Sequence, residues 1–145
     1  MKPAVKKADG ANAEVILVRA DGALILQQRD DKPGMTNPGF ISSFGGHIEP
    51  GEEPLEAAVR EINEETNLQL SPADLKFFGK YRKTKAEHGE DWDVYYFIAR
   101  NISGAGLEVY EGQGFKVVQN EQELSTLKAT KMLQQALKDY WKRFK

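Results

Sequence analysis

Three glutamates, Glu61, Glu64 and Glu65, carry the strongest chemical signal in the sequence. Their spacing places all three carboxylates on one face if the segment is a helix. Mg²⁺ prefers carboxylate oxygens together with water and substrate phosphate oxygens, and Mn²⁺ accepts the same ligands. The spacing therefore indicates a site for Mg²⁺ or Mn²⁺. The competing interpretation is a solvated acidic helix face, which is the simpler explanation for these three residues taken alone.

The residues around this acidic face favour the metal site. Gly45 and Gly46 precede it in the chain, and paired glycines let backbone groups approach a metal or a phosphate closely. Arg60 adds a fixed cation beside the acids. At that position it is expected to pair with Glu56 or Glu64 and to hold one of them in place.

The two segments 46–52 and 60–68 resemble the Nudix box, G-x5-E-x7-R-E-U-x-E-E-x-G-U, in which U is a bulky aliphatic residue. Eight of its nine specified positions are met, by Gly46, Glu52, Arg60, Glu61, Ile62, Glu64, Glu65 and Leu68. The ninth, usually glycine, is Asn67. Asn67 is expected to end the helix in its place, because asparagine tolerates the left-handed conformation next best after glycine.

The resemblance implies hydrolysis of a diphosphate linkage in a nucleoside diphosphate joined to another group, with bound Mg²⁺ or Mn²⁺ and an activated water. It also implies the metal ligands, which would be the Gly45 carbonyl and the carboxylates of Glu61, Glu64 and Glu65. Arg60 joins these glutamates in the catalytic set. Glu52 is a weaker candidate that would lie near the site or pair with other side chains.

The general base is the feature that transfers least between members of this family. Some members take it from a glutamate in a later loop, within a segment like Glu111-Gly112-Gln113. The resemblance therefore implies Glu111 as a metal ligand or base. The competing explanation is that Glu111 belongs to a flexible loop, and Glu108 and Glu90 are the alternatives.

Arg29 matches the position at which related proteins use an arginine on substrate phosphate. A guanidinium group suits that role because it donates two parallel hydrogen bonds to phosphate oxygens. A surface charge at the end of a strand is the competing interpretation.

The elements that must position these residues can be predicted from periodicity and turn signals. Apolar runs at 14–19 and 24–28 flank Asp21-Gly22, which is typical of a β-hairpin. Residues 54–67 form the clearest helix, with Pro54 at its first position. Shorter signals predict strands over 40–44, 75–85, 92–100, 107–110 and 115–119, a loop over 86–91, and a last helix from about residue 130.

This order predicts an α/β fold, a Nudix-like α/β/α sandwich with a mixed central sheet. Residues 1–11 are predicted to form a flexible basic tail, and residues 12–145 a single domain. The chain of 145 residues has a net charge of -2 and no cysteine. No stable nucleic-acid binding is therefore expected, and disulfide and thiolate metal sites are excluded.

The longest apolar run, at 15–18, is too short to span a bilayer. We therefore expect a cytoplasmic protein whose partner is a small nucleotide or nucleotide derivative. A homodimer is compatible with the sequence. No pattern selects one substrate among nucleoside triphosphates, nucleotide sugars and dinucleoside polyphosphates. Two other functions stay open: a Nudix-fold module that senses a nucleotide without cutting it, and a structural protein with a solvated acidic helix.

Overall fold

A computed structural model describes residues 8–35, 37–84 and 90–144. The described residues form one sheet of seven strands in the order β3-β2-β1-β6-β5, with β4 paired to β1 and β7 paired to β2. The strands are β1 Gly10–Val18, β2 Leu24–Gln28, β3 Ile41–Ser42, β4 Phe44–His47, β5 Leu75–Lys83, β6 Trp92–Ala99 and β7 Phe115–Val118. β1 and β6 run parallel while the other pairs are antiparallel, so the sheet is mixed, as predicted.

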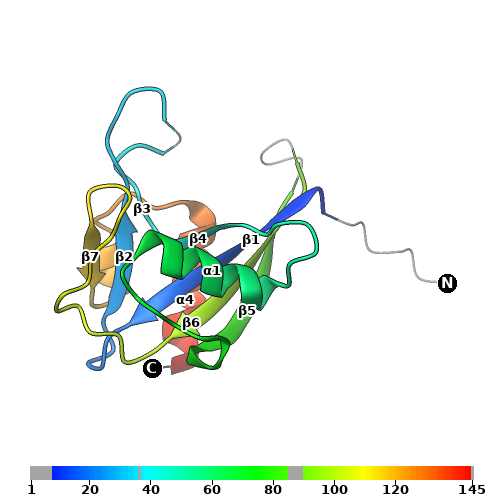
Figure 1. Cartoon of the computed structure of the whole chain (residues 1–145). Helices are drawn as coiled ribbons and strands as arrows, with labels where there is room; N and C mark the ends of the chain where they lie inside the picture. The colour runs from blue at the N-terminus through cyan, green and yellow to red at the C-terminus, as the bar shows by residue number, and fades with distance from the viewer. Residues whose placement is uncertain (1–7, 36, 85–89, 145) are drawn as a thin grey trace.

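Helices cover both faces of this sheet (Figure 1). Helix α1, Pro54–Glu65, lies on one face, and α4, Lys131–Phe144, lies on the other beside the short α3, Glu121–Leu124. A single 3₁₀ turn, η1, spans Pro72–Asp74. None of the helices in these described stretches has the length and apolarity to span a bilayer. The predicted α/β/α sandwich is confirmed.

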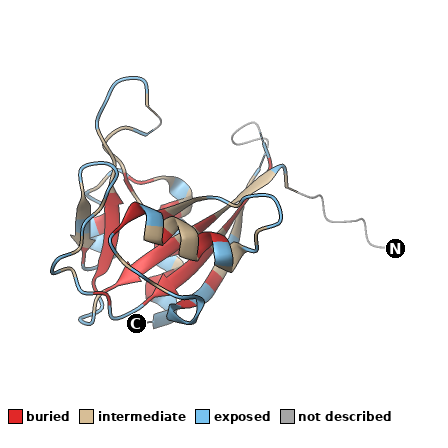
Figure 2. Cartoon of the chain, in the orientation of Figure 1, coloured by how far each residue is buried: buried red, intermediate tan, exposed pale blue. Residues whose placement is uncertain are grey.

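Strand β1 shows how the sequence builds the two cores. Its side chains alternate between the faces, so Val15 and Leu17 pack with Ile62 of α1, whereas Ile16 packs with Leu133 of α4. Figure 2 shows the buried residues concentrated in the central strands and the inner faces of the helices. A strand covered on both sides must be apolar nearly throughout, and Glu14 interrupts that run.

Helix α1 begins as its sequence predicts and ends earlier. Pro54 occupies its first turn, and Glu53 and Glu56 form a reciprocal capping box. The helix ends at Glu65 because Thr66 is extended and pairs with Val109 as an isolated bridge. The prediction of a left-handed backbone conformation at Asn67 is wrong. In the described stretches, the residues other than glycine with positive φ are Asn37 and Asn101.

Several predicted boundaries differ from the structure. β1 begins at Gly10, inside the predicted basic tail, because it pairs with β6 from Gly10 to Leu17; residues 1–7 lie outside the described residues. The predicted strand at 107–110 contains only the bridge at Val109. Helix α3 was not predicted, although Asn120 caps it by accepting from the Glu123 N–H at 2.9 Å. Most of the predicted loop at 86–91 also lies outside the described residues.

Candidate active site

The site lies where two strands share one edge of β1. The first half of β1 pairs with β4, at Asn12 to Val15, and its end pairs with β2, at Leu17 and Val18. β2 and β4 therefore diverge, and a cleft opens between them. Its lining includes Glu14, Arg29, Ser43, Gly45, Glu65 and Glu111. Four of the residues predicted for the site are thus brought together.

Gly45 and Gly46 lie within β4, beyond the end of the strand predicted at 40–44. They pair with Glu14 and Ala13 of β1. A β-carbon at Gly45 would collide with the Oε2 atom of Glu14, and one at Gly46 would lie 2.6 Å from the carboxyl carbon of Glu61. The absence of two side chains therefore lets two carboxyl groups approach the same stretch of backbone, one from β1 and one from α1.

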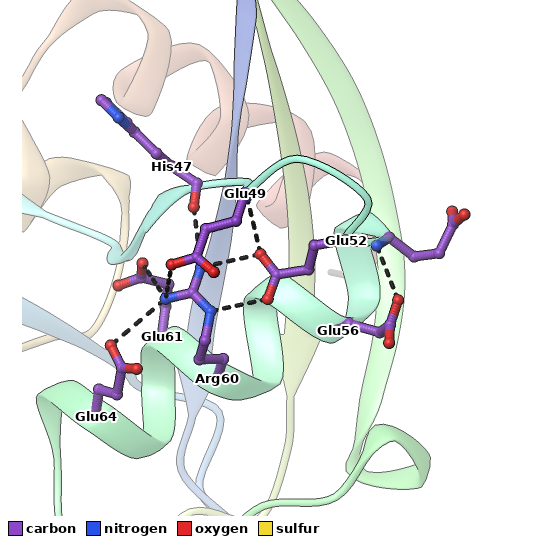
Figure 3. Close-up of polar contacts among 8 residues, drawn as sticks. His47, Glu49, Glu52, Glu56, Arg60, Glu61 and Glu64 are labelled. Atoms are coloured by element: carbon purple, nitrogen blue, oxygen red, sulfur yellow. Dashed lines mark hydrogen bonds and ion pairs between the residues drawn. The ribbon is translucent and has the colours of Figure 1, made fainter.

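Arg60 organises the acidic face of α1 (Figure 3). Its guanidinium group donates to both oxygens of Glu52, at 2.8 and 3.0 Å, and to Glu61 at 2.9 Å. Glu64 lies at 3.5 Å. The bidentate pair with Arg60 lowers the pKa of Glu52 to about 2. Arg60 also donates to the His47 carbonyl at 3.0 Å, so it ties the segment before the helix to the glutamates on the helix.

Glu56, one of the two partners predicted for Arg60, has a different role. Its carboxylate accepts from the backbone N–H of Glu53 at 2.9 Å and so caps the first turn of α1. Glu64, the other predicted partner, does contact Arg60.

Glu65 is the buried member of the acidic set. Its Oε1 accepts a hydrogen bond from the Gly45 N–H at 2.8 Å. Burial raises the pKa of Glu65 to about 8, and the negative charges of Glu61 and Glu111 add to the rise. A cation bound nearby would reverse this shift, because it stabilises the ionised carboxylate.

Glu111 reaches the cleft on a loop that is held at both ends. On one side the Tyr110 N–H donates to the Glu65 carbonyl at 2.8 Å; on the other the Gln113 N–H donates to the Gln28 carbonyl at 2.8 Å. A β-carbon at Gly112, where φ is 73°, would collide with that same carbonyl. The structure thus gives Glu111 a defined place. The alternatives Glu90 and Glu108 are exposed and do not line the cleft.

Arg29 follows directly after β2 and lines the same cleft as Glu65 and Glu111. Its Nε donates to the Asn37 carbonyl at 3.3 Å, which ties it to the loop between β2 and β3. Among the described residues, Arg29 is the only lysine or arginine on this lining, and it is the residue to which the resemblance assigns phosphate binding.

The donor set has the chemistry for the divalent metal that the resemblance implies, but its side chains are held apart. Within the described residues, no three His, Asp or Glu side chains lie close enough to hold a metal ion as they stand. Arg60 accounts for this, because it draws Glu61 and Glu64 toward itself, while Glu65 is turned to the Gly45 amide. The chemistry still fits, because the set is made of hard oxygen donors. The pKa of Glu65 is raised first by burial and then by the negative charge of Glu61 and Glu111, and a bound cation would offset that charge.

Sequence reasoning missed Glu14. Its Oε1 accepts from the Ser43 hydroxyl at 2.8 Å, and burial raises its pKa to about 8. Among the described residues its Oε2 has no hydrogen-bond partner. The sequence did contain a signal for Glu14, which is a single carboxylate in the apolar run of β1. A carboxylate rarely lies in a covered strand without a partner or a ligand.

The chain belongs to the NUDIX domain family, whose profile matches residues 9–138. Solved structures agree in fold. A MutT protein from Methanosarcina mazei Go1 superposes with a TM-score of 0.77 at 18% identity, covering 98% of this chain and 99% of that one. An Ap4A hydrolase from C. elegans gives 0.67 at 19% identity, with coverage of 94% and 98%.

Among curated proteins, the m7GpppN-mRNA hydrolase NUDT17 of Xenopus laevis is 36% identical over 64 residues. That match covers 44% of this chain and 22% of the relative. The chain spans only about a fifth of the length of the curated relatives it matches.

Proposed function

We propose that this protein hydrolyses the diphosphate linkage of a nucleoside diphosphate joined to another group, such as a nucleoside triphosphate, using Mg²⁺ or Mn²⁺ and an activated water. One observation carries the proposal: the buried carboxyl of Glu65, the carboxylate of Glu111 and the guanidinium of Arg29 line a single cleft. Membership of the NUDIX domain family supports it. So do the relatives named as an mRNA cap hydrolase and an Ap4A hydrolase.

The acidic residues and Arg60 have different roles in the proposed reaction. The Gly45 carbonyl and the carboxylates of Glu61, Glu64, Glu65 and Glu111 would hold the metal, which when bound lowers the pKa of water and neutralises phosphate charge. Arg60 would keep Glu61 and Glu64 oriented through its hydrogen bonds to both carboxylates.

The residues proposed as general base and as phosphate ligand both line the cleft. Glu111 would accept the proton of the attacking water, a role supported by the loop contacts that hold it beside Glu65. Arg29 would bind a phosphate oxygen, which needs charge neutralisation as the bond to the leaving group breaks.

Product formation from a panel of nucleoside triphosphates, nucleotide sugars and dinucleotides tests the proposal, with Mg²⁺ present and absent. Glu64→Gln is the test variant, and Glu121→Gln is its matched control: the two side chains are 60% and 57% exposed. We expect turnover that requires the metal and falls at least a hundredfold in Glu64→Gln alone. Tight nucleotide binding without turnover would instead identify a nucleotide sensor.

A further inference from the structure

Glu14 lies at the junction between the cleft and a second cavity, because it lines both. The first is the cleft of Glu65 and Glu111. The second is a cavity of about 140 Å³ on the α4 side of the sheet, with Phe40, Val94 and Met132 in its wall. Both are lined by the same five residues, which are Asn12, Glu14, Arg29, Ser42 and Ser43. A ligand that occupied both hollows would pass over these residues.

The size and lining of the cavity suit a planar ring. Its volume is close to that of the roughly 150 Å³ cavity that accepts a benzene ring in a well-studied protein. The apolar side chains of its wall, which also contains polar residues such as Lys83 and Thr130, would pack against the faces of such a ring. The cleft, in contrast, is lined by Glu65 and Glu111, which the proposed function assigns to the metal, while Arg29, which it assigns to phosphate, lines both the cleft and the cavity. A nucleotide placed in this way has its base in the cavity, its diphosphate in the cleft and its pentose at the junction.

The junction offers an unused acceptor. Oε2 of Glu14 is shielded from solvent and has no partner within the described residues, and the Ser43 hydroxyl donates to Oε1. A buried carboxyl oxygen without a partner is unfavourable. A pentose hydroxyl is a donor of the right reach, and an acidic side chain on a ribose hydroxyl recurs in nucleotide-binding proteins.

We propose that Glu14 selects ribonucleotide substrates, by accepting a hydrogen bond from a hydroxyl of the ribose as the carboxyl turns toward the junction. The inference rests on the proposed function and narrows its substrate class. Oε2 lies against the Gly45 backbone, where a β-carbon would collide with it, so the carboxyl must turn away from Gly45 to face the junction. A deoxyribose analogue would leave the buried carboxyl unpaired, and sites built around one polar contact reject analogues that lack it.

The test compares kcat/KM for each of the four ribonucleoside triphosphates with its 2′-deoxy and 3′-deoxy forms. The wild-type protein should prefer at least one ribonucleotide over one of its deoxy forms by tenfold or more. Glu14→Met, which removes both oxygens, should bring that ratio close to one by lowering turnover of the ribonucleotide. Glu14→Gln, which keeps one acceptor oxygen, should give an intermediate ratio. Glu121→Gln should leave the ratio at the wild-type value.

Two results would overturn the inference. Equal kcat/KM values for ribo- and deoxy-forms in the wild type would refute it while leaving the hydrolase function intact, whereas no turnover and no binding of any nucleotide would refute that function first. A tenfold loss of Mn²⁺ affinity in Glu14→Met, measured with the metal alone and with an unchanged sugar preference, would make Glu14 part of the metal site instead. Thermal unfolding checks that Glu14→Met folds, and Glu14→Gln decides if it does not.

Discussion

The side chain of Asn67 holds the backbone on both sides of Leu107: its Oδ1 accepts from the Glu108 N–H at 2.9 Å, and its Nδ2 donates to the Gly106 carbonyl at 2.8 Å. Asn67 stands where the Nudix box usually has glycine. Asn67 does not end the helix, which stops at Glu65; its side chain instead fastens the segment that leads to Glu111 close to the end of α1.

Asn67→Ala should lower turnover by acting through Glu111. Removal of two hydrogen bonds at an exposed site should reduce the free energy of unfolding by only about 1 kcal/mol. The loop would then hold Glu111 less firmly, and we expect kcat to fall about tenfold with little change in KM. Steady-state kinetics and urea unfolding measure the two effects.

A double-mutant cycle separates positioning from general destabilisation. In a Glu111→Gln background, Asn67→Ala should have almost no further effect on kcat, since the group that it positions is already gone. Independent, multiplicative losses would show that Asn67 does not act through Glu111.

Arg60→Lys should disable the site despite keeping the charge. A lysine cannot donate two parallel hydrogen bonds to Glu52 and also reach Glu61 and the His47 carbonyl. We expect kcat/KM to fall at least tenfold. Arg82→Lys is the matched control, because Arg82 makes a similar bidentate pair with Asp93, at 2.8 and 3.3 Å, away from the cleft. Equal losses of activity in the two variants would contradict a specific role for Arg60.

The buried carboxyl groups predict how stability depends on pH in the metal-free protein. The pKa of Glu14 rises from its ordinary value of 4.5 to about 8 on folding. Between those values the folded protein keeps a proton that the unfolded chain releases, so the contribution of Glu14 to stability is fully present below pH 4.5 and is lost as pH rises toward 8. One such group contributes a slope of at most about 1.4 kcal/mol per pH unit.

Urea unfolding at pH 5 and pH 8 in the presence of EDTA measures this slope. Glu14→Gln cannot titrate, so it should lose less stability than the wild-type protein across the interval. Glu65 still contributes to both proteins, because burial also raises its pKa to about 8. The difference between the two slopes therefore isolates Glu14, and identical slopes would rule out a raised pKa at this residue.

Local signals in the sequence predicted the parts of the site that depend on spacing along one helix. The acidic face of α1 and the pairing of Arg60 with Glu64 follow from positions three and four residues apart. The position of Glu14 cannot be predicted from local spacing. It depends on which strands flank β1 and on where β2 and β4 diverge. The isolated bridge between Thr66 and Val109 could not be predicted either, because the two residues lie 43 positions apart in the chain.

Gly46→Ala tests whether the close approach of Glu61 to the backbone matters for function. The added methyl group would lie 2.6 Å from the Glu61 carboxyl carbon, so the carboxylate must move aside. The φ angle at Gly46 is not positive, and alanine can adopt that backbone conformation without strain. We therefore expect a stability change within about 1 kcal/mol, since the tip of a glutamate side chain can rotate away. Mn²⁺ affinity and kcat/KM should each fall about tenfold or more.

Gly104→Ala is the matched control, because its methyl group would meet nothing nearer than the Arg19 Cδ at 3.9 Å. Unchanged metal affinity in Gly46→Ala would show that Glu61 does not need its place beside β4.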